Sequence, residues 1–554
     1  MSETQGLDEV RLSTAQEFTH EVNSEETATR PDGARGQIAR AAALVLFAFI
    51  ISNIIGLGHQ LVSSQLFGTS EVLDSFNAAN RLTELLFNLV AGGALGSAFI
   101  PIFTGMLTRK DLQGAWKLAS GVINVVSIAL VGVALLFWIF APWVVQNVIY
   151  ILAPGTSIGQ LDLTVRLLRI MLPTVVIFGV SGLFMGILNA HQHFLIPALA
   201  PALYSLGIIG GALIWHKAVG VESLAYGTLI GALLHLLVQV PSLIRLKSRS
   251  YTLHEGLRDP HVRRVVTLML PRLVGAGVVQ LNFVVNTMIA LGLEPGSTAA
   301  LSFAFILFMM PQRMIAQSAG IASLPTLSAQ AELKQFDAMR STLASILRGI
   351  LLLAIPSTIG LILVRYPLVR VLLERGEFNA RSTSMVAWGL MWYAAGLVGH
   401  CLVEVLSRAF YALHDTRTPV GVGIGAMGLN IGLSFLLSGW FRSMGQFGLG
   451  GLALANSVAT GIESIILILI LRKRLGGLAG RSILDSAWKA IIGAILMGAG
   501  ILALSATFAG RSLVTLLSGV FAGVVIYGLI MYLFKVPEFR QLLAALKRRL
   551  ARLG

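Results

Sequence analysis

The residues best placed to do chemistry are charged side chains inside long apolar stretches of the chain. Arg313 follows Pro311 and Gln312 in the middle of the apolar run 301–324. A charge at the centre of a bilayer costs a few kcal/mol unless it faces a partner or a water-filled cavity. Proline frees a backbone carbonyl and bends a helix, as in the broken helices that line transporter cavities. We therefore predict that Arg313 faces a polar cavity, where its cation attracts an anion.

Other ionisable residues at membrane depth have competing explanations. Arg81 and Glu84 are three positions apart, hence on one helix face, where they can neutralise each other. Arg272 follows Pro271 near a segment end, so its side chain can instead reach the membrane surface. Polar residues crowd the first two apolar segments, which is consistent with a hydrated cavity there. The further cavity candidates are Asn53, His59, Asn88 and, at a segment end, Asp74.

Sequence motifs of enzymes and metal sites are missing. The chain contains no HExxH, no P-loop and no paired cysteines, and the glycine run 421–425 lies inside an apolar segment with no strand before it. That run favours close helix packing over a nucleotide-binding loop. We expect a transporter rather than an enzyme, with no catalytic residue, no metal and no cofactor. Membrane potential and a monovalent cation both stay open as driving forces.

The elements that must position these residues are membrane-spanning helices. The chain is 55% apolar and only 12% charged, with a mean hydropathy of +0.80. About 20 consecutive apolar residues span a bilayer as a helix. We expect an all-α membrane protein with about fourteen spans, which start near residues 38, 74, 116, 163, 195, 222, 264, 299, 341, 382, 419, 448, 483 and 511.

Internal similarity indicates a duplicated unit. Residues 188–197 (LNAHQHFLIP) resemble 410–419 (FYALHDTRTP), about 222 positions later, and 97–101 (SAFIP) resemble 322–325 (ASLP) at nearly the same offset. Many transporters are built from such repeats. We predict a disordered tail (1–36), a first lobe of six helices (37–248), a second lobe of six (249–475), two further helices (476–536) and a basic C-terminal helix (537–554).

Charge in the short loops predicts the orientation. The net charge of +15 is concentrated in the loops after the second, sixth and twelfth spans and at the C-terminus, whereas several alternate loops hold no Lys or Arg. Positive loops stay cytoplasmic, so we place both termini there and interpret the charge as topology rather than nucleic-acid binding. The loop 365–381 is an exception with four arginines. Its stretch 369–374 is typical of an amphipathic surface helix.

Several turn motifs resemble those of the MurJ/MviN lipid II flippase family. They are 52–56 (SNIIG), 67–69 (FGT), 74–77 (DSFN), 93–101 (GALGSAFIP), 186–190 (GILNA), 196–201 (IPALAP), 408–412 (RAFYA) and 415–419 (DTRTP). The resemblance implies the multidrug/oligosaccharidyl-lipid/polysaccharide exporter fold and the flipping of a polyprenyl-pyrophosphate-linked peptidoglycan precursor by alternating access. It also implies that the last two helices offer a groove for the polyprenyl tail.

The chain departs from this family at the charged positions of the cavity. Where the family usually has arginines in its first helix, this chain has Asn53 and His59, and the arginine of the second helix falls at Phe87. The charged residues of the eighth helix fall at Phe305, Ile306 and Met309, and an acidic residue of the second helix falls at Gly92. Asp74 and Arg81 match. Either Arg81, Arg272 and Arg313 take over the grip on pyrophosphate, or the substrate has changed.

Our interpretation is a divergent lipid II flippase in the bacterial cytoplasmic membrane, in contact with membrane lipids and an anionic lipid-linked precursor. The alternatives are a flippase for another lipid-linked glycan and a non-transporting scaffold that contacts proteins of cell-wall synthesis. A drug antiporter would need a buried acid, for which Glu404 is the best candidate. The sequence leaves the exact substrate, the coupling ion and the oligomeric state open.

Overall fold

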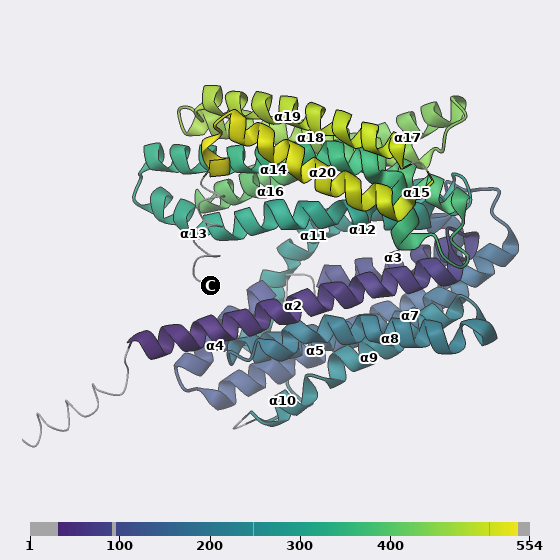
Figure 1. Cartoon of the computed structure of the whole chain (residues 1–554). Coiled ribbons are helices and arrows are strands. Elements are labelled where there is room, and N and C mark those ends of the chain that lie inside the picture. Colours follow the sequence, from purple (N-terminus) through teal and green to yellow (C-terminus); the bar gives the residue numbers. More distant parts are fainter. Residues whose placement is uncertain (1–30, 91–95, 247–248, 509, 541–554) are drawn as a thin grey trace, which may run out of the picture.

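The protein is a pair of helical bundles that meet at one end (Figure 1). The computed structural model describes residues 31–90, 96–246, 249–508 and 510–540, and all regular structure within these residues is helical. Most of the predicted N-terminal tail and C-terminal helix lies outside the described residues. The all-α membrane architecture predicted from composition is confirmed.

The first bundle contains the helices of the N-terminal half. They are α2 (Pro31–Phe67), α3 (Glu71–Val90), α4 (Gly96–Thr108), α5 (Leu112–Ile139), the short α6 (Ala141–Val144) with the π-helix η2 (Val145–Ile149), α7 (Ile158–Ala190), α8 (Leu195–Val219), α9 (Glu222–Leu237) and α10 (Val240–Ile244).

The second bundle repeats this order and adds two helices. Its members are α11 (Pro260–Leu291), α12 (Ser297–Gln312), the π-helix η3 (Arg313–Gln317), α13 (Ser318–Glu332), α14 (Phe336–Leu373), α15 (Ala380–Ala395), α16 (Leu397–Ala412), α17 (Arg417–Ser443) and α18 (Leu449–Arg474). The additional helices α19 (Gly480–Thr507) and α20 (Ser512–Leu533) pack against α14.

The two lobes share one pattern of neighbours. In the first, α8 packs on α9 and α2, and α3 on α7; in the second, α17 packs on α18 and α11, and α12 on α15. Pro101 lies in α4 and Pro325 in α13, while Pro197 and Pro419 lie near the starts of α8 and α17. The matched prolines thus occupy corresponding helices, as the duplicated sequence predicts.

The number of membrane spans, about fourteen by sequence, stays a prediction. Among the described residues, 11 helices are long and apolar enough to cross a membrane, or up to 12 when the pair α15 and α16, bent by 48°, counts as one span. All fourteen predicted segments coincide with helices. α3 is not among the 11, and it carries Glu71, Asp74, Arg81 and Glu84 within 20 residues.

Helix contacts are close where glycines face each other. A Cβ atom at Gly207 of α8 would lie 2.3 Å from the Cα of Gly231 in α9, and one at Gly211 would lie 2.5 Å from the Cα of Gly227. Small residues allow backbones to approach in this way, and helix association inside a bilayer depends on such packing. Substitution of either glycine pair would separate the two helices.

The arginine-rich stretch 365–381 differs from its prediction. Val369–Glu374 does not form a separate surface helix, because α14 continues unbroken through Leu373 for 38 residues. A helix of that length exceeds the roughly 20 residues that a bilayer requires. A helix of 38 residues is long enough for its last turns, which carry Arg365 and Arg370, to extend beyond the hydrocarbon core.

Candidate functional site

The strongest candidate, Arg313, lies at a break in the helix that faces the other lobe. Pro311 supplies no backbone N–H and its ring crowds the preceding turn, so the α-helical hydrogen bonds shift there and the π-helix η3 begins at Arg313. The guanidinium donates to Oδ1 of Asn53 on α2 at 3.3 Å. Both side chains are exposed. Among the described residues, no carboxylate lies within ion-pair distance of Arg313.

The second candidate, Arg81, is neutralised as its spacing suggests. It donates to Glu84 at 2.9 Å, and the amide of Asn80 donates to the other carboxylate oxygen at 3.0 Å. Its guanidinium also lies 5.2 Å from the ring centre of Phe283 on α11, in the second lobe. Arg81 thus points across the interface between the lobes but keeps little free charge.

The pair Glu404 and Arg408 on α16 is also self-neutralised. The two side chains are 2.5 Å apart. Arg408 packs over Gly320 of α13, where a Cβ atom would lie only 2.8 Å from its Nε. Glu404 is therefore half of an ion pair that braces α16 against α13, which weakens the drug-antiporter alternative.

The remaining cavity candidates are dispersed. His59 and Asn88 are half-buried, and neither makes a side-chain hydrogen bond within the described part of the chain. The side chain of Arg272 lies outside the described residues. Of the six candidates whose side chains the structure describes, only Arg313 and Asn53 are in contact with each other.

Asp74 belongs to a different site, a seal between the lobes. Its carboxylate is buried and accepts the backbone N–H of Gly296 at 2.7 Å and of Ala299 at 2.8 Å. These donors are the unpaired amides at the start of α12, where the helix dipole also favours a negative charge. A side chain of the first lobe thus caps a helix of the second.

Close backbone contacts complete this seal. Thr69 donates to Ser382 at 2.8 Å, and the backbone N–H of Glu377 donates to the carbonyl of Gln65 at 2.9 Å. Gly296 has a φ of +88°, and a Cβ atom there would lie 2.2 Å from the carbonyl oxygen of Thr69. We call the contacts around Thr69, Asp74, Gly296 and Ser382 the seal, and the membrane face on which they lie the seal face.

Sequence reasoning did not find the residues that Asp74 and Thr69 contact. Gly296 and Ala299, the partners of Asp74, and Ser382, the partner of Thr69, carry no charge and lie at or next to the first turn of a helix, so nothing in their local sequence marks them. One signal was available: Gly296 lies 222 positions after Asp74, the same offset that relates the two repeats. Equivalent segments near a repeat axis are expected to meet.

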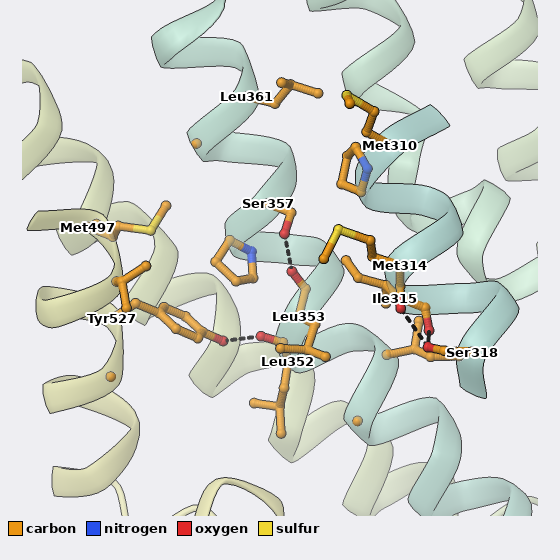
Figure 2. Close-up of a pocket in the computed structure, with 18 of the residues that line it drawn as sticks. Met310, Met314, Ile315, Ser318, Leu352, Leu353, Ser357, Leu361, Met497 and Tyr527 are labelled. Carbon is orange, nitrogen blue, oxygen red and sulfur yellow. Dashed lines mark hydrogen bonds between the residues drawn. The ribbon is translucent and has the colours of Figure 1, made fainter. Parts of the chain in front are cut away.

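A long apolar groove runs beside the break at Arg313. It has a volume of about 1260 Å³. Figure 2 shows Met310, Met314 and Ile315 on one side of it, Leu353 and Leu361 of α14 in the middle, and Met497 and Tyr527 of α19 and α20 on the other. Tyr527 donates to the carbonyl of Leu352 at 2.7 Å, which fixes α20 to α14. Glu538 also lines the groove, and it forms an ion pair with Arg348 of α14 at 2.5 Å.

Each lobe also contains a buried polar network. In the first, Ser181 contacts Nδ1 of His235 at 2.7 Å and accepts from Gln239 at 2.6 Å. In the second, Asn286 of α11 donates to Asn430 of α17 at 2.9 Å. These contacts join helices within one lobe, and we assign them to helix packing.

Two helical lobes that meet at one end, with a cation between them that lies at a helix break and has no carboxylate partner among the described residues, define a multi-span transporter fold. Comparison with solved structures agrees. An inward-facing multidrug resistance MATE family transporter of the MOP superfamily is similar to this chain with a TM-score of 0.63 at 17% identity, covering 79% of this chain and 98% of that one. Identity that low supports the fold alone.

The chain belongs to the MurJ family. The model of that family, described as "Lipid II flippase MurJ", matches residues 63–531. Similar relatives are the lipid II flippase MurJ of Burkholderia cenocepacia, 32% identical over 78% of this chain and 84% of its own, and a probable lipid II flippase of Bdellovibrio bacteriovorus, 31% identical over 84% and 87%. A solved structure titled "Lipid II flippase MurJ, inward closed conformation" matches with a TM-score of 0.76 at 25% identity, covering 90% and 100%.

Proposed function

We propose that this protein flips lipid II, the polyprenyl-pyrophosphate-linked precursor of peptidoglycan, across the bacterial cytoplasmic membrane by alternating access. The observation that carries the proposal is Arg313. It is a cation at a broken helix, directed at the other lobe, with no carboxylate partner among the described residues. A fixed cation of this kind attracts a pyrophosphate strongly where the surroundings exclude water.

The neighbouring groove fits the other end of such a substrate. Met310 and Met314, on either side of Arg313 in sequence, line the groove that continues to α19 and α20. Flexible thioether side chains accommodate irregular apolar ligands. We propose that the polyprenyl chain lies in the groove while the pyrophosphate is held at Arg313.

The closed seal supports the proposal of a transport cycle by representing one of its states, in which the two lobes are in contact at the seal face. We propose that both termini are cytoplasmic and that the seal face is external, following the positive loops of the sequence. The substrate then enters from the cytoplasmic side while the seal is closed, and it leaves after the seal has opened. Binding to proteins of cell-wall synthesis stays a separate proposal, and no contact among the described residues bears on it.

The test is to replace Arg313 with Ala and with Lys and to measure flipping of labelled lipid II in vesicles. We expect activity to fall at least about a hundredfold with Ala, since the charge-assisted contact is lost, and to be partly retained with Lys. Arg245→Ala, an exposed arginine at the end of α10, is the matched control. Full activity of a normally inserted Arg313→Ala protein would rule out this site.

A second candidate, a flippase for another lipid-linked glycan, is favoured by the aromatic residues in the second lobe. Phe305, where the family has a charged residue, lies 5.4 Å from Tyr393 and 5.9 Å from Phe308, centre to centre. Flipping assays with lipid II and with other polyprenyl-pyrophosphate glycans separate the two candidates. Complementation of a MurJ-depleted bacterium would support lipid II, whereas complementation failure with active flipping of another glycan would favour the second.

A further inference from the structure

The segment that joins the two lobes is fastened to the first lobe by one buried asparagine. The side-chain nitrogen of Asn124 on α5 donates to the backbone carbonyls of residues 252, 253 and 255 at 2.9, 3.2 and 3.0 Å. Its side-chain oxygen accepts from the hydroxyl of Tyr251 at 2.5 Å. Four contacts of one side chain thus hold residues 249–259, which we call the linker, on α5.

Two neighbours of this asparagine complete the attachment. The backbone N–H of Thr252 donates to the hydroxyl of Ser120 at 3.2 Å. Gly121 leaves no space for a side chain, because a Cβ atom there would lie 2.5 Å from Cγ2 of Val262 on α11. Both the linker and the first turn of α11 therefore pack directly on a helix of the first lobe.

Asn124 lies on a face of α5 that is exposed along the rest of the helix. Ile128, Val131 and Leu135 follow it at spacings of four, three and four residues, so all of them lie on one face. These three side chains are exposed, and α5 is one of the helices that can cross a membrane. An exposed apolar face of such a helix contacts lipid, and the linker covers the same face one turn earlier.

The linker crosses α5 near the membrane border opposite the seal face. At the other end of α5, Trp138 is exposed and Arg169 lies over its ring at 4.8 Å. Tryptophan is enriched at the membrane–water interface. Ser120 precedes Trp138 by 18 residues, or about 27 Å at 1.5 Å per residue. The hydrocarbon core is about 30 Å thick, so Ser120 and the linker on it lie close to the second border.

The outer side of the linker carries apolar and basic side chains. Tyr251, Leu253 and Leu257 are 58%, 76% and 57% exposed. Four exposed arginines flank them without a carboxylate in ion-pair distance within the described part of the chain, at positions 249, 258, 263 and 264. Of the two acids in the linker, Glu255 is half-buried, and Asp259 caps the start of α11. The exposed charge is therefore positive.

This combination matches the headgroup region of a leaflet that contains anionic lipid. Apolar side chains at that depth enter the boundary between headgroups and acyl chains, and guanidinium groups form charge-assisted hydrogen bonds with phosphates. Because Asn124 already holds the linker backbone, little conformational entropy is lost when a lipid binds. An isolated anion would use the arginines but would leave the leucines in water.

We propose that the linker binds anionic phospholipid headgroups in the leaflet opposite the seal face, with Asn124 as the residue that positions it. In the orientation proposed above this is the cytoplasmic leaflet. The inference goes beyond the proposed function and does not depend on it. Since the linker is attached to the first lobe, the lipid is bound by that lobe.

The test uses the full-length protein in nanodiscs of zwitterionic lipid that contain a phosphatidylglycerol with a photoreactive group beside its phosphate. We expect cross-links to peptides that contain residues 249–258. Arg249→Gln combined with Arg258→Gln should lower their yield about tenfold, because two charge-assisted contacts are lost. Leu253→Ser combined with Leu257→Ser should also lower it, because the apolar contact with the leaflet is lost.

The controls separate this site from general effects of charge and of asparagine loss. Arg417→Gln combined with Arg472→Gln makes the same change in charge at exposed positions of the second lobe and should leave the linker cross-links unchanged. Asn124→Ala should lower their yield. Asn147→Ala should not, since the amide of Asn147 donates to the carbonyl of Trp143 on its own segment, at 3.1 Å.

An unaltered yield in the normally inserted Arg249/Arg258 variant would overturn the inference. Equal cross-linking by the matching phosphatidylcholine probe would overturn it as well, because the site would not distinguish an anionic headgroup. Absence of linker cross-links, with a cysteine at Leu253 protected from a water-soluble reagent only after addition of a cytoplasmic extract, would indicate a protein partner instead.

Discussion

At the scale of single residues, the decisive property is whether a charge inside the membrane has a partner. Arg81 and Arg408 each contact a carboxylate on their own helix, at 2.9 Å and 2.5 Å, whereas the one side-chain partner of Arg313 among the described residues is the neutral Asn53. The pairing of Arg81 with Glu84 was one of the two explanations that the sequence left open, since a spacing of three residues places both side chains on one helix face, and Glu404 with Arg408, four apart, follows the same geometry. The sequence did not predict the contact of Arg313 with Asn53, because this joins residues 260 positions apart.

Asp74 leads to a prediction about the balance of conformations. Asp74→Asn keeps one acceptor for the amides of Gly296 and Ala299 but removes the negative charge at the start of α12. Hydrogen bonds to a charged group contribute about 1.5–3 kcal/mol, so the seal should be weakened by that order. We expect label accessibility at the seal face to rise and can measure it with a cysteine at Thr69.

The matched control for this variant is Asp111→Asn. Asp111 caps α5 by accepting from the backbone N–H of Gly114 at 2.8 Å, but it is exposed and makes no recorded contact with the second lobe. Its variant should leave accessibility at the seal face unchanged. Equal effects of the two variants would refute a special role for Asp74.

At the scale of elements, helix positions could be predicted and their irregularities could not. All fourteen predicted apolar segments coincide with helices, because a run of apolar residues in a bilayer must satisfy its backbone hydrogen bonds internally. Pro311 predicted a broken helix, but the sequence did not show that the break takes the form of the π-helix η3, which contacts α16. The continuation of α14 to Leu373 was missed because the arginines were interpreted as the mark of a separate surface helix.

The start of α17 leads to a prediction on pH. Asp415 accepts from the hydroxyl and the backbone N–H of Thr418 at 2.6 and 3.0 Å and from Arg474 at 2.6 Å, and these contacts, Thr418 first, lower the pKa of Asp415 to about 2. A lowered pKa stabilises the folded state above the ordinary pKa of about 3.8, and this stabilisation is lost as the pH falls through about 2.

Asp415→Ala should therefore lower the free energy of unfolding at neutral pH by about 1 kcal/mol, as for other losses of a helix cap. Thermal unfolding in detergent should show the difference from wild type at pH 7. The difference should shrink between pH 4 and pH 2, where Asp415 becomes protonated. A gap between the variant and the wild type that is unchanged at pH 2 would contradict this account.

At the scale of the whole molecule, the two lobes are joined by the contacts of the seal, and the proposed transport cycle requires these contacts to break. The seal joins the segments around Thr69 and Asp74 to those around Gly296 and Ser382, and in Figure 1 this is the end at which α3 meets α12. The duplicated sequence predicted two lobes. It could not predict which face they close, because both faces are compatible with the same helices.

A reversible cross-link tests this seal directly. Thr69→Cys with Ser382→Cys, in a Cys401→Ser background, places two thiols where two hydroxyl oxygens are 2.8 Å apart. Oxidation should hold the seal closed and abolish flipping, and a reductant should restore it. Each single-cysteine variant should flip normally under both conditions. Undiminished flipping with the cross-link formed would show that the seal stays closed throughout the cycle.

Orientation can be settled by labelling from one side. Arg249→Cys, in the linker between the lobes, and Pro295→Cys, before α12, are both exposed positions. We expect a membrane-impermeant reagent outside the cell to label the cysteine at 295 and not the one at 249, since the positive loop near Lys247 should be cytoplasmic. Labelling of both cysteines from one side would contradict the predicted topology.

The contact between Asp74 and Gly296 also constrains how such a chain arose. If a single ancestral lobe once paired with an identical copy, the same position of each copy would have met near the symmetry axis. Two aspartates there would repel, and two glycines would leave both helix starts uncapped. The seal requires an acid from one half and bare backbone amides from the other. In a single fused chain the two halves are free to differ, and here one supplies the acceptor and the other the donors of this contact.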